Sequence, residues 1–146
     1  MRINRVLETS LYVRDLDEAK HFYITVLGAE VGSEEHGRHV FFQVGRQMLL
    51  LFVADVSRDP VGAIPPHGCD GTGHVAFAMA HDEISSWSEQ LAAHGVEVVQ
   101  RLDWPNGAVS LYFRDPSDNL LELVTPCLWF ADECPRPSPH HPGNPD

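Results

Sequence analysis

Runs of alternating apolar and polar residues, separated by turns that contain Gly or Pro, dominate the pattern of this chain. In the first half, runs rich in β-branched and aromatic residues predict strands at residues 6–13, 30–34, 39–44 and 47–53. The stretch between the first two runs has helical spacing, with Asp15 as its N-cap and Gly28 where the helix should end. The first half is therefore predicted to follow the order β-α-β-β-β.

The second half repeats this order. Its predicted strands are residues 73–80, 96–102, 108–114 and 120–125. Asp82 is expected to cap the intervening helix and Gly95 to end it. A repeat of this size is one supersecondary unit used twice, and two such units can share one core and one site. The pattern thus predicts an α+β fold built from paired βαβββ modules.

Superimposing the halves brings chemically interesting positions together. A slide of 66 residues places Glu8 on His74, and a slide of 71 places Leu51 on Glu122. Three of these four positions carry residue types that bind metals, and the fourth is apolar. The long connection at residues 55–72 is rich in Gly and Pro and serves either as a linker or as a flap over the site.

The length of 146 residues suits one domain, predicted at residues 1–130. Within it, the first module should span about residues 3–54 and the second about residues 73–126. The Pro-rich segment 131–146 has little apolar content and is expected to be a disordered tail. The net charge of -11 argues against nucleic acid or an anionic membrane as a partner, because phosphates would be repelled.

Cysteine usage and the N-terminus indicate a compartment. Three cysteines without a C-x-x-C motif favour reduced thiols over a disulfide framework. The N-terminus lacks the apolar segment of a signal peptide. No apolar run approaches the roughly 20 residues that cross a bilayer. A cytoplasmic protein is therefore expected.

A metal site is the sharpest chemical hypothesis. Glu8, His74 and Glu122 interrupt otherwise apolar strands at positions related by the repeat. A carboxylate buried alone is costly, and a bound cation is one of the few things that offset this cost. A carboxylate–His–carboxylate set suits Fe, Mn, Zn or Ni and does not choose among these divalent ions. Taken singly, each of the three residues has a simpler reading as a solvated or hydrogen-bonded polar side chain.

Three further residues are candidates for catalysis. Tyr112 and Arg114 alternate with apolar residues and should share a face with Glu122, where they could orient an anionic or phenolic substrate. His67 lies on the long connection and could close over a substrate. Motifs for nucleotide binding or serine hydrolysis are absent from the sequence.

Three stretches resemble the vicinal oxygen chelate superfamily of glyoxalases, bleomycin-resistance proteins and extradiol dioxygenases. They are LYVRDLDEAKHFY at residues 11–23 with VLG at 26–28, GHVAF at 73–77, and YFRDPSDNLLEL at 112–123. The resemblance implies paired βαβββ modules whose mixed sheets form a barrel-like cup around a metal, with the helices outside. It also implies that His74 and Glu122 are ligands and places Glu8 where His or Gln is more usual.

The resemblance further implies a metal-dependent lyase, isomerase or dioxygenase acting on a small substrate that chelates the metal through adjacent oxygens. Leu51 occupies the position of the remaining ligand, which in glyoxalase I is also an acid/base carboxylate, so ordinary glyoxalase I chemistry is disfavoured. The alternative is a metal-free protein that sequesters an antibiotic or other small molecule, as bleomycin-resistance proteins do. A homodimer is favoured, with the modules paired within a chain or exchanged between chains.

Overall fold

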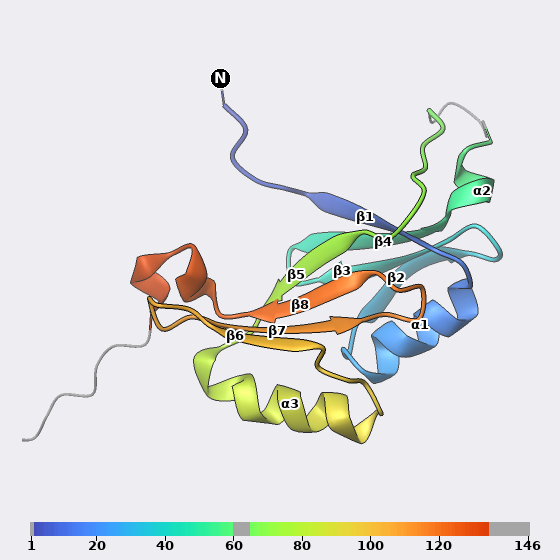
Figure 1. Ribbon diagram of the computed structural model, residues 1–146. Helices are drawn as coiled ribbons and strands as arrows, with labels where there is room; N and C mark the ends of the chain where they lie inside the picture. The colour runs from blue at the N-terminus through green and yellow to red at the C-terminus, as the bar shows by residue number, and fades with distance from the viewer. Residues whose placement is uncertain (1, 60–64, 135–146) are drawn as a thin grey trace, which may run out of the picture.

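The computed structural model describes residues 2–59 and 65–134, and it contains the two predicted modules (Figure 1). The first module comprises β1 (Glu8–Val13), α1 (Leu16–Thr25), β2 (Glu30–Glu35), β3 (His39–Val44), β4 (Gln47–Val53) and the short helix α2 (Ala54–Ser57). The second comprises β5 (His74–Ala78), η1 (His81–Glu83), α3 (Ile84–Ala93), β6 (Gln100–Asp103), β7 (Val109–Arg114) and β8 (Leu120–Val124). The single turns η2 (Pro126–Leu128) and η3 (Ala131–Glu133) follow.

Each module forms a four-stranded mixed sheet with the same strand order. The orders are β1-β4-β3-β2 and β5-β8-β7-β6, with the first pair of strands parallel and the other pairs antiparallel. The predicted α+β fold with two βαβββ modules is therefore confirmed. No helix in the described part of the chain is long and apolar enough to span a bilayer.

The helix ends follow the predicted chemistry in α1 and depart from it in α3. Asp15 caps α1, since its Oδ1 accepts the backbone N–H of Glu18 at 2.9 Å, and Gly28 follows at a φ of 65°. The prediction that Asp82 caps the second helix is wrong. A 3₁₀ turn comes first, and Glu83 accepts the backbone N–H of Ala80 at 2.8 Å instead.

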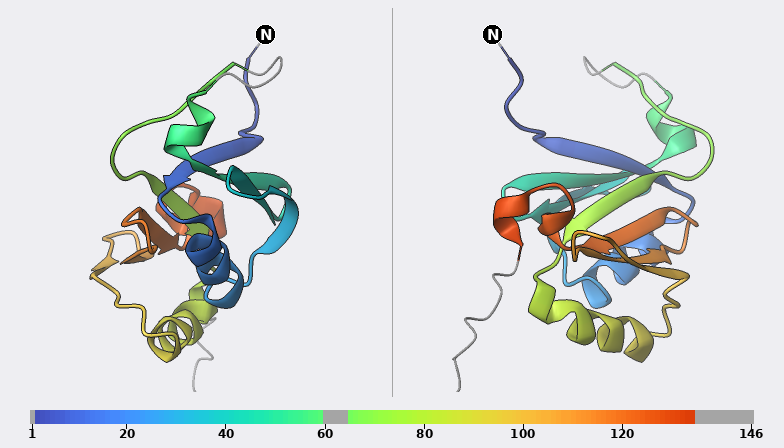
Figure 2. Two further views of the ribbon diagram at one scale, coloured as in Figure 1. Left: turned by 90° about the vertical axis from the view of Figure 1, so that its right-hand side faces the viewer. Right: turned by 60° about the vertical axis from the view of Figure 1, so that its left-hand side comes forward.

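The core lies where the helix-facing sides of both sheets meet α1 and α3. Leu49 and Leu51 of the first sheet and Leu121 and Leu123 of the second are each at most 2% exposed and belong to one apolar cluster. Figure 2 shows the two modules from two further directions, with α1 and α3 on the same side of the molecule. The two modules therefore share one hydrophobic core.

A buried polar network joins the modules at the turn between β7 and β8. The side chain of Asn119, fully buried, accepts the backbone N–H of Gly73 at 2.7 Å and donates to the carbonyl of Tyr12 at 3.1 Å. Asp115 accepts a second N–H of the same amide at 2.9 Å and the hydroxyl of Tyr23 at 3.1 Å. This turn thus connects β1, α1 and the entrance to β5.

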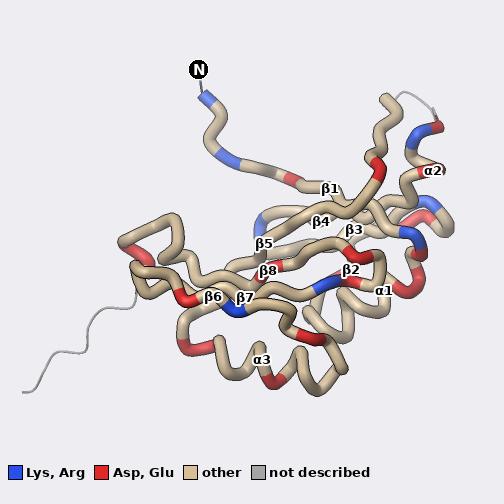
Figure 3. Tube along the Cα trace, viewed as in Figure 1, with Lys and Arg blue, Asp and Glu red and all other residues tan. Residues whose placement is uncertain are grey.

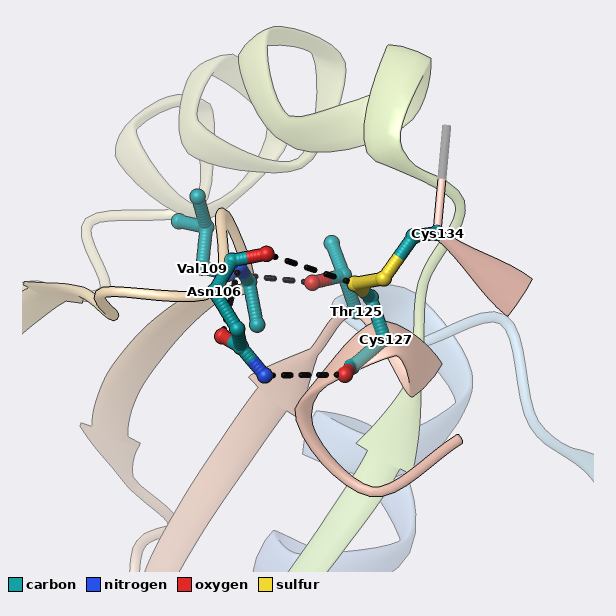
Figure 4. Close-up of a disulfide and its surroundings, with 6 residues drawn as sticks. Asn106, Val109, Thr125, Cys127 and Cys134 are labelled. Carbon is teal, nitrogen blue, oxygen red and sulfur yellow. Dashed lines mark hydrogen bonds between the residues drawn. A yellow bond between two sulfur atoms is a disulfide. The ribbon is translucent and has the colours of Figure 1, made fainter. Parts of the chain in front are cut away.

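A disulfide closes the segment after β8, contrary to the prediction of reduced thiols. Cys127 and Cys134, seven positions apart in the sequence, are bonded with their Cα atoms 4.5 Å apart, because η2 and η3 fold this segment back on itself (Figure 4). Cys69 is the remaining thiol and is exposed. The segment predicted to be a disordered tail thus begins with an ordered turn, η3. The rest of that prediction concerns residues 135–146, which lie outside the described residues.

Candidate metal centre

His74 and Glu122 lie side by side on the face of the second sheet opposite α3. The parallel register of β5 and β8 pairs Ala76 with Glu122, and the imidazole Nε2 of His74 lies 3.4 Å from Oε2 of Glu122. The other ring nitrogen, Nδ1, lies 2.9 Å from the backbone carbonyl of Leu120. Because only an N–H can donate to that carbonyl, this contact places a proton on Nδ1 and leaves Nε2 as the ring nitrogen that faces Glu122 and could ligate a metal.

The carboxylate of Glu122 is buried and only partly satisfied. Its side chain is 7% exposed, and within the described residues Oε1 has no hydrogen-bond partner. A buried carboxylate oxygen without a partner is costly unless a cation or a ligand donor meets it. The pair thus offers an imidazole nitrogen and carboxylate oxygens to one point in space. This donor set fits a divalent ion of the first transition row.

Tyr112 adjoins this pair, as its sequence position predicts. It lies directly across from Glu122 in the antiparallel register of β7 and β8, and its ring centroid is 6.4 Å from that of His74. Burial raises the pKa of the Tyr112 phenol, and the neighbouring Glu122 carboxylate raises it further. The phenol therefore stays protonated at neutral pH and can donate a hydrogen bond.

The other two catalytic candidates lie elsewhere. Arg114 is exposed, and its guanidinium is held by Asp118, donating to the backbone carbonyl at 2.8 Å and lying 3.3 Å from the carboxylate. His67 lies against the first module, where its Nδ1 is 2.8 Å from the hydroxyl of Tyr12 and its ring packs edge-on against Phe52. His67 thus packs on the first sheet, and neither residue has a described contact with the His74–Glu122 pair.

Glu8, the third predicted ligand, is not gathered with the pair. It is exposed at the start of β1 and pairs in register with Met48. Among the described residues, no group of three or more His, Cys, Asp or Glu side chains is close enough to hold a metal ion. One protomer therefore supplies two of the three predicted ligands at one place.

The strand registers also correct the apolar fourth position. In the second sheet β5, which carries His74, pairs with β8 as β1 pairs with β4 in the first sheet. By this pairing Leu120 corresponds to Met48, and Glu122 corresponds to Leu50. The proposed match of Leu51 with Glu122 is therefore wrong by one residue. Since successive side chains of a strand point to opposite faces, Leu51 lies in the core, whereas Leu50 shares the face of the predicted site.

A group of aromatic side chains on that face of the first sheet was not predicted as part of the site. The His39 ring stacks on Phe41 with centroids 4.1 Å apart, and Phe41 meets Phe52 edge-on at 5.4 Å. The Nδ1 of His39 is buried without a hydrogen-bond partner in the described structure, and burial lowers the pKa of this imidazole. The alternation in residues 39–44 could have revealed this face, because it places His39 and Phe41 on the same side.

Comparison with known proteins now defines the class. The model of the Glyoxalase/Bleomycin resistance protein/Dioxygenase superfamily matches residues 2–123, which is most of the chain. The protein belongs to this superfamily. The resemblance carried by the three sequence stretches is confirmed.

Individual relatives are similar to this chain at different levels. A lactoylglutathione lyase from Agrobacterium tumefaciens is 39% identical with a TM-score of 0.85, over 88% of this chain and 98% of that one. A fosfomycin resistance protein from Listeria monocytogenes is 22% identical with a TM-score of 0.67, over 90% and 98% respectively, and shares the fold. The glyoxalase domain-containing protein RDO1 of Mycosarcoma maydis is 33% identical over 75% of this chain. The matched part spans 61% of that relative's length.

Proposed function

We propose that the protein is a divalent-metal-dependent enzyme acting on a small substrate that chelates the metal through adjacent oxygens. The observation that carries this proposal is the His74–Glu122 pair, with the imidazole fixed by Leu120 and one carboxylate oxygen left without a partner among the described residues. A bound divalent ion would act as a Lewis acid toward the oxygens of the substrate. Tyr112 would donate a hydrogen bond to one of those oxygens. Arg114 and His67 are held by other partners, so we assign neither of them a role in the chemistry.

We infer that Glu8 of a second copy completes the metal site in a homodimer. Within one protomer Glu8 is exposed and apart from the pair, and the His74 side chain is 48% exposed. The two residues directly before Glu8 are exposed and apolar, with Val6 63% and Leu7 58% accessible. Apolar exposure next to Glu8 supports the inference that a second chain covers this surface.

Metal binding tests the first part. Purified without chelators, the protein should contain stoichiometric metal, and titration calorimetry should give one site for each protomer. Glu122→Gln and His74→Ala should each weaken binding by roughly 100-fold or more, since each changes a ligand, and loss of a ligand's hydrogen-bonded partner alone costs about 10–100-fold. Glu89→Gln, an exposed change on α3, should leave binding unchanged. A protein without metal whose ligand variants bind added metal as the wild type does would refute the proposal.

Mixing variants tests the second part. In Glu8→Ala and His74→Ala homodimers every site lacks one ligand. A heterodimer of the two keeps one site with both residues intact only if those residues come from different protomers. Metal binding that returns on mixing supports the shared site, whereas no return in a mixture shown by light scattering and mass analysis to contain heterodimers refutes it.

Lactoylglutathione lyase activity is a second candidate, supported by the 39% identity to the Agrobacterium tumefaciens enzyme. The apolar Leu50, where the equivalent strand of the second sheet carries Glu122, argues against it because this position lacks a carboxylate that could act as an acid or base. Formation of lactoylglutathione by the metal-loaded protein would favour this candidate. One-to-one binding of a small molecule that survives a chelator, without turnover, would instead favour the metal-free sequestration alternative.

A further inference from the structure

A recess lies between the modules on the helix side of the sheets, away from the candidate metal centre. Its volume is about 410 Å³, within the range of pockets that hold small organic ligands. The described residues that line it do not include Glu8, His74, Glu122 or Tyr112. The lining residues that matter for a ligand are Glu30, Gln43, Leu49, Phe77, Trp87 and Leu123.

The interior of the recess is apolar and aromatic. Leu49 of the first sheet and Leu123 of the second are each at most 2% exposed, and Phe77 and Trp87 are half-buried. Both modules therefore contribute to the walls. Such walls favour a ligand body that is aromatic or a bulky hydrocarbon, because its transfer from water buries apolar area on both surfaces.

The polar part of the recess carries one sign of charge. Glu30, which begins β2, is exposed and is the one charged side chain among the described lining residues. The amide of Gln43 donates to the carbonyl of Gly45 at 3.2 Å, which leaves its own carbonyl oxygen to accept a hydrogen bond. Acidic positions are also distributed over both modules, and the chain has a net charge of -11 (Figure 3). The potential therefore favours a cation and disfavours an anion.

We propose that this recess binds a small organic amine with an aromatic body, its ammonium group at Glu30 and its ring between Phe77 and Trp87. The ligand would contact both modules and so stabilise their packing. The site is independent of the metal centre, on the opposite side of the second sheet. Its test therefore does not depend on metal binding.

A matched series of three probes tests the charge and the body separately. 2-Phenylethylamine, 2-phenylethanol and 3-phenylpropionate have similar phenyl-alkyl bodies but are cationic, neutral and anionic at pH 7. By titration followed by amide and indole NMR, the amine should bind about fivefold more tightly than the alcohol, as expected for a partly exposed ion pair. The acid should bind more weakly than both. The perturbed resonances should include Gly28, Gly45 and the Trp87 indole.

Two variants make the proposal falsifiable. Glu30→Gln should remove the preference for the amine over the alcohol, whereas Glu97→Gln, an exposed change outside the recess, should keep it. Ala29→Phe should fill the recess and abolish binding of both. Should Ala29→Phe fail to fold, Glu30→Gln still decides. Equal affinity for amine and acid, an unchanged preference in Glu30→Gln, or shifts centred on His74 would overturn the assignment.

Discussion

Replacing Asn119 by Ala should strongly destabilise the protein, because this amide joins the two modules. Its side chain is fully buried and makes three hydrogen bonds, to the N–H of Gly73, the carbonyl of Tyr12 and the carboxylate of Asp115. Tyr12 belongs to the first module, whereas Gly73 leads into β5 of the second. Truncation therefore removes a connection that neither module can make alone.

The expected loss follows from those three bonds. Each buried hydrogen bond contributes a net amount of about 1 kcal/mol, and a donor left without a partner costs about 1–3 kcal/mol. The Gly73 N–H would lose its acceptor, whereas Asp115 would keep the hydroxyl of Tyr23 and two backbone donors. The total loss in the free energy of unfolding should be about 3–5 kcal/mol, a large share of the roughly 5–15 kcal/mol typical of a domain.

Urea denaturation followed by circular dichroism measures this loss. Asn119→Asp distinguishes hydrogen bonding from packing, because the new carboxylate can still accept from Gly73 but faces the carboxylate of Asp115. It should be at least as destabilised as Asn119→Ala at pH 7. Gln100→Ala, an exposed change on β6, should stay within about 0.5 kcal/mol of the wild type. A loss below about 1 kcal/mol for Asn119→Ala would refute the role of this amide in joining the modules.

Three further predictions concern backbone, pH and redox state. Gly95→Ala should lower the free energy of unfolding by about 1 kcal/mol from backbone strain alone, since φ is 70° and no atom crowds the position; an unchanged urea midpoint would contradict this. Burial lowers the pKa of His39, so as the pH falls the unfolded chain takes up a proton at this imidazole before the folded protein does. The stability of the wild type should therefore drop more steeply below about pH 6.5 than the stability of His39→Phe. Parallel pH profiles of the two proteins would exclude the effect. Alkylation with mass analysis should find one thiol, Cys69, before reduction and three after it. Reduction should lower the free energy of unfolding by about 2 kcal/mol. Three thiols in untreated protein would show that Cys127 and Cys134 are unpaired.

The order of elements could be predicted because the apolar period differs between strands and helices. The runs at residues 39–44 and 47–53 coincide with β3 and β4, and Asp15 and Gly28 bound α1 as their chemistry requires. The strand predicted at residues 96–102 is instead β6, beginning at Gln100. The residues before it leave α3 and pack Val96 and Val98 against the core, so their apolar character reflects packing without a sheet partner.

The candidate site could be predicted in part. His74, Tyr112 and Glu122 come together because the neighbouring strands β5, β8 and β7 carry them on one face; alternation predicts the face within each strand, and the strand order brings the residues together. The distance of Glu8 from this pair depends on how two sheets pack, and the sequence pattern contains no equivalent rule for that packing. The Cys127–Cys134 bond was missed for a similar reason, since it depends on the turns η2 and η3 and not on spacing.

The error at Leu51 has a local cause in the two hairpins. In the first module, Val44 and Gln47 face each other across a two-residue turn, Gly45 and Arg46. In the second, Asp115 and Asn119 occupy the equivalent positions, and three residues separate them. The difference in residue number between equivalent positions of the two halves therefore grows from 71 before the turn to 72 after it. A shift of one residue along β4 is enough to exchange a side chain that faces the core for one that faces the site. The extra residue belongs to the same turn that holds Asp115 and Asn119, so the junction between the modules and the asymmetry of the site share one origin.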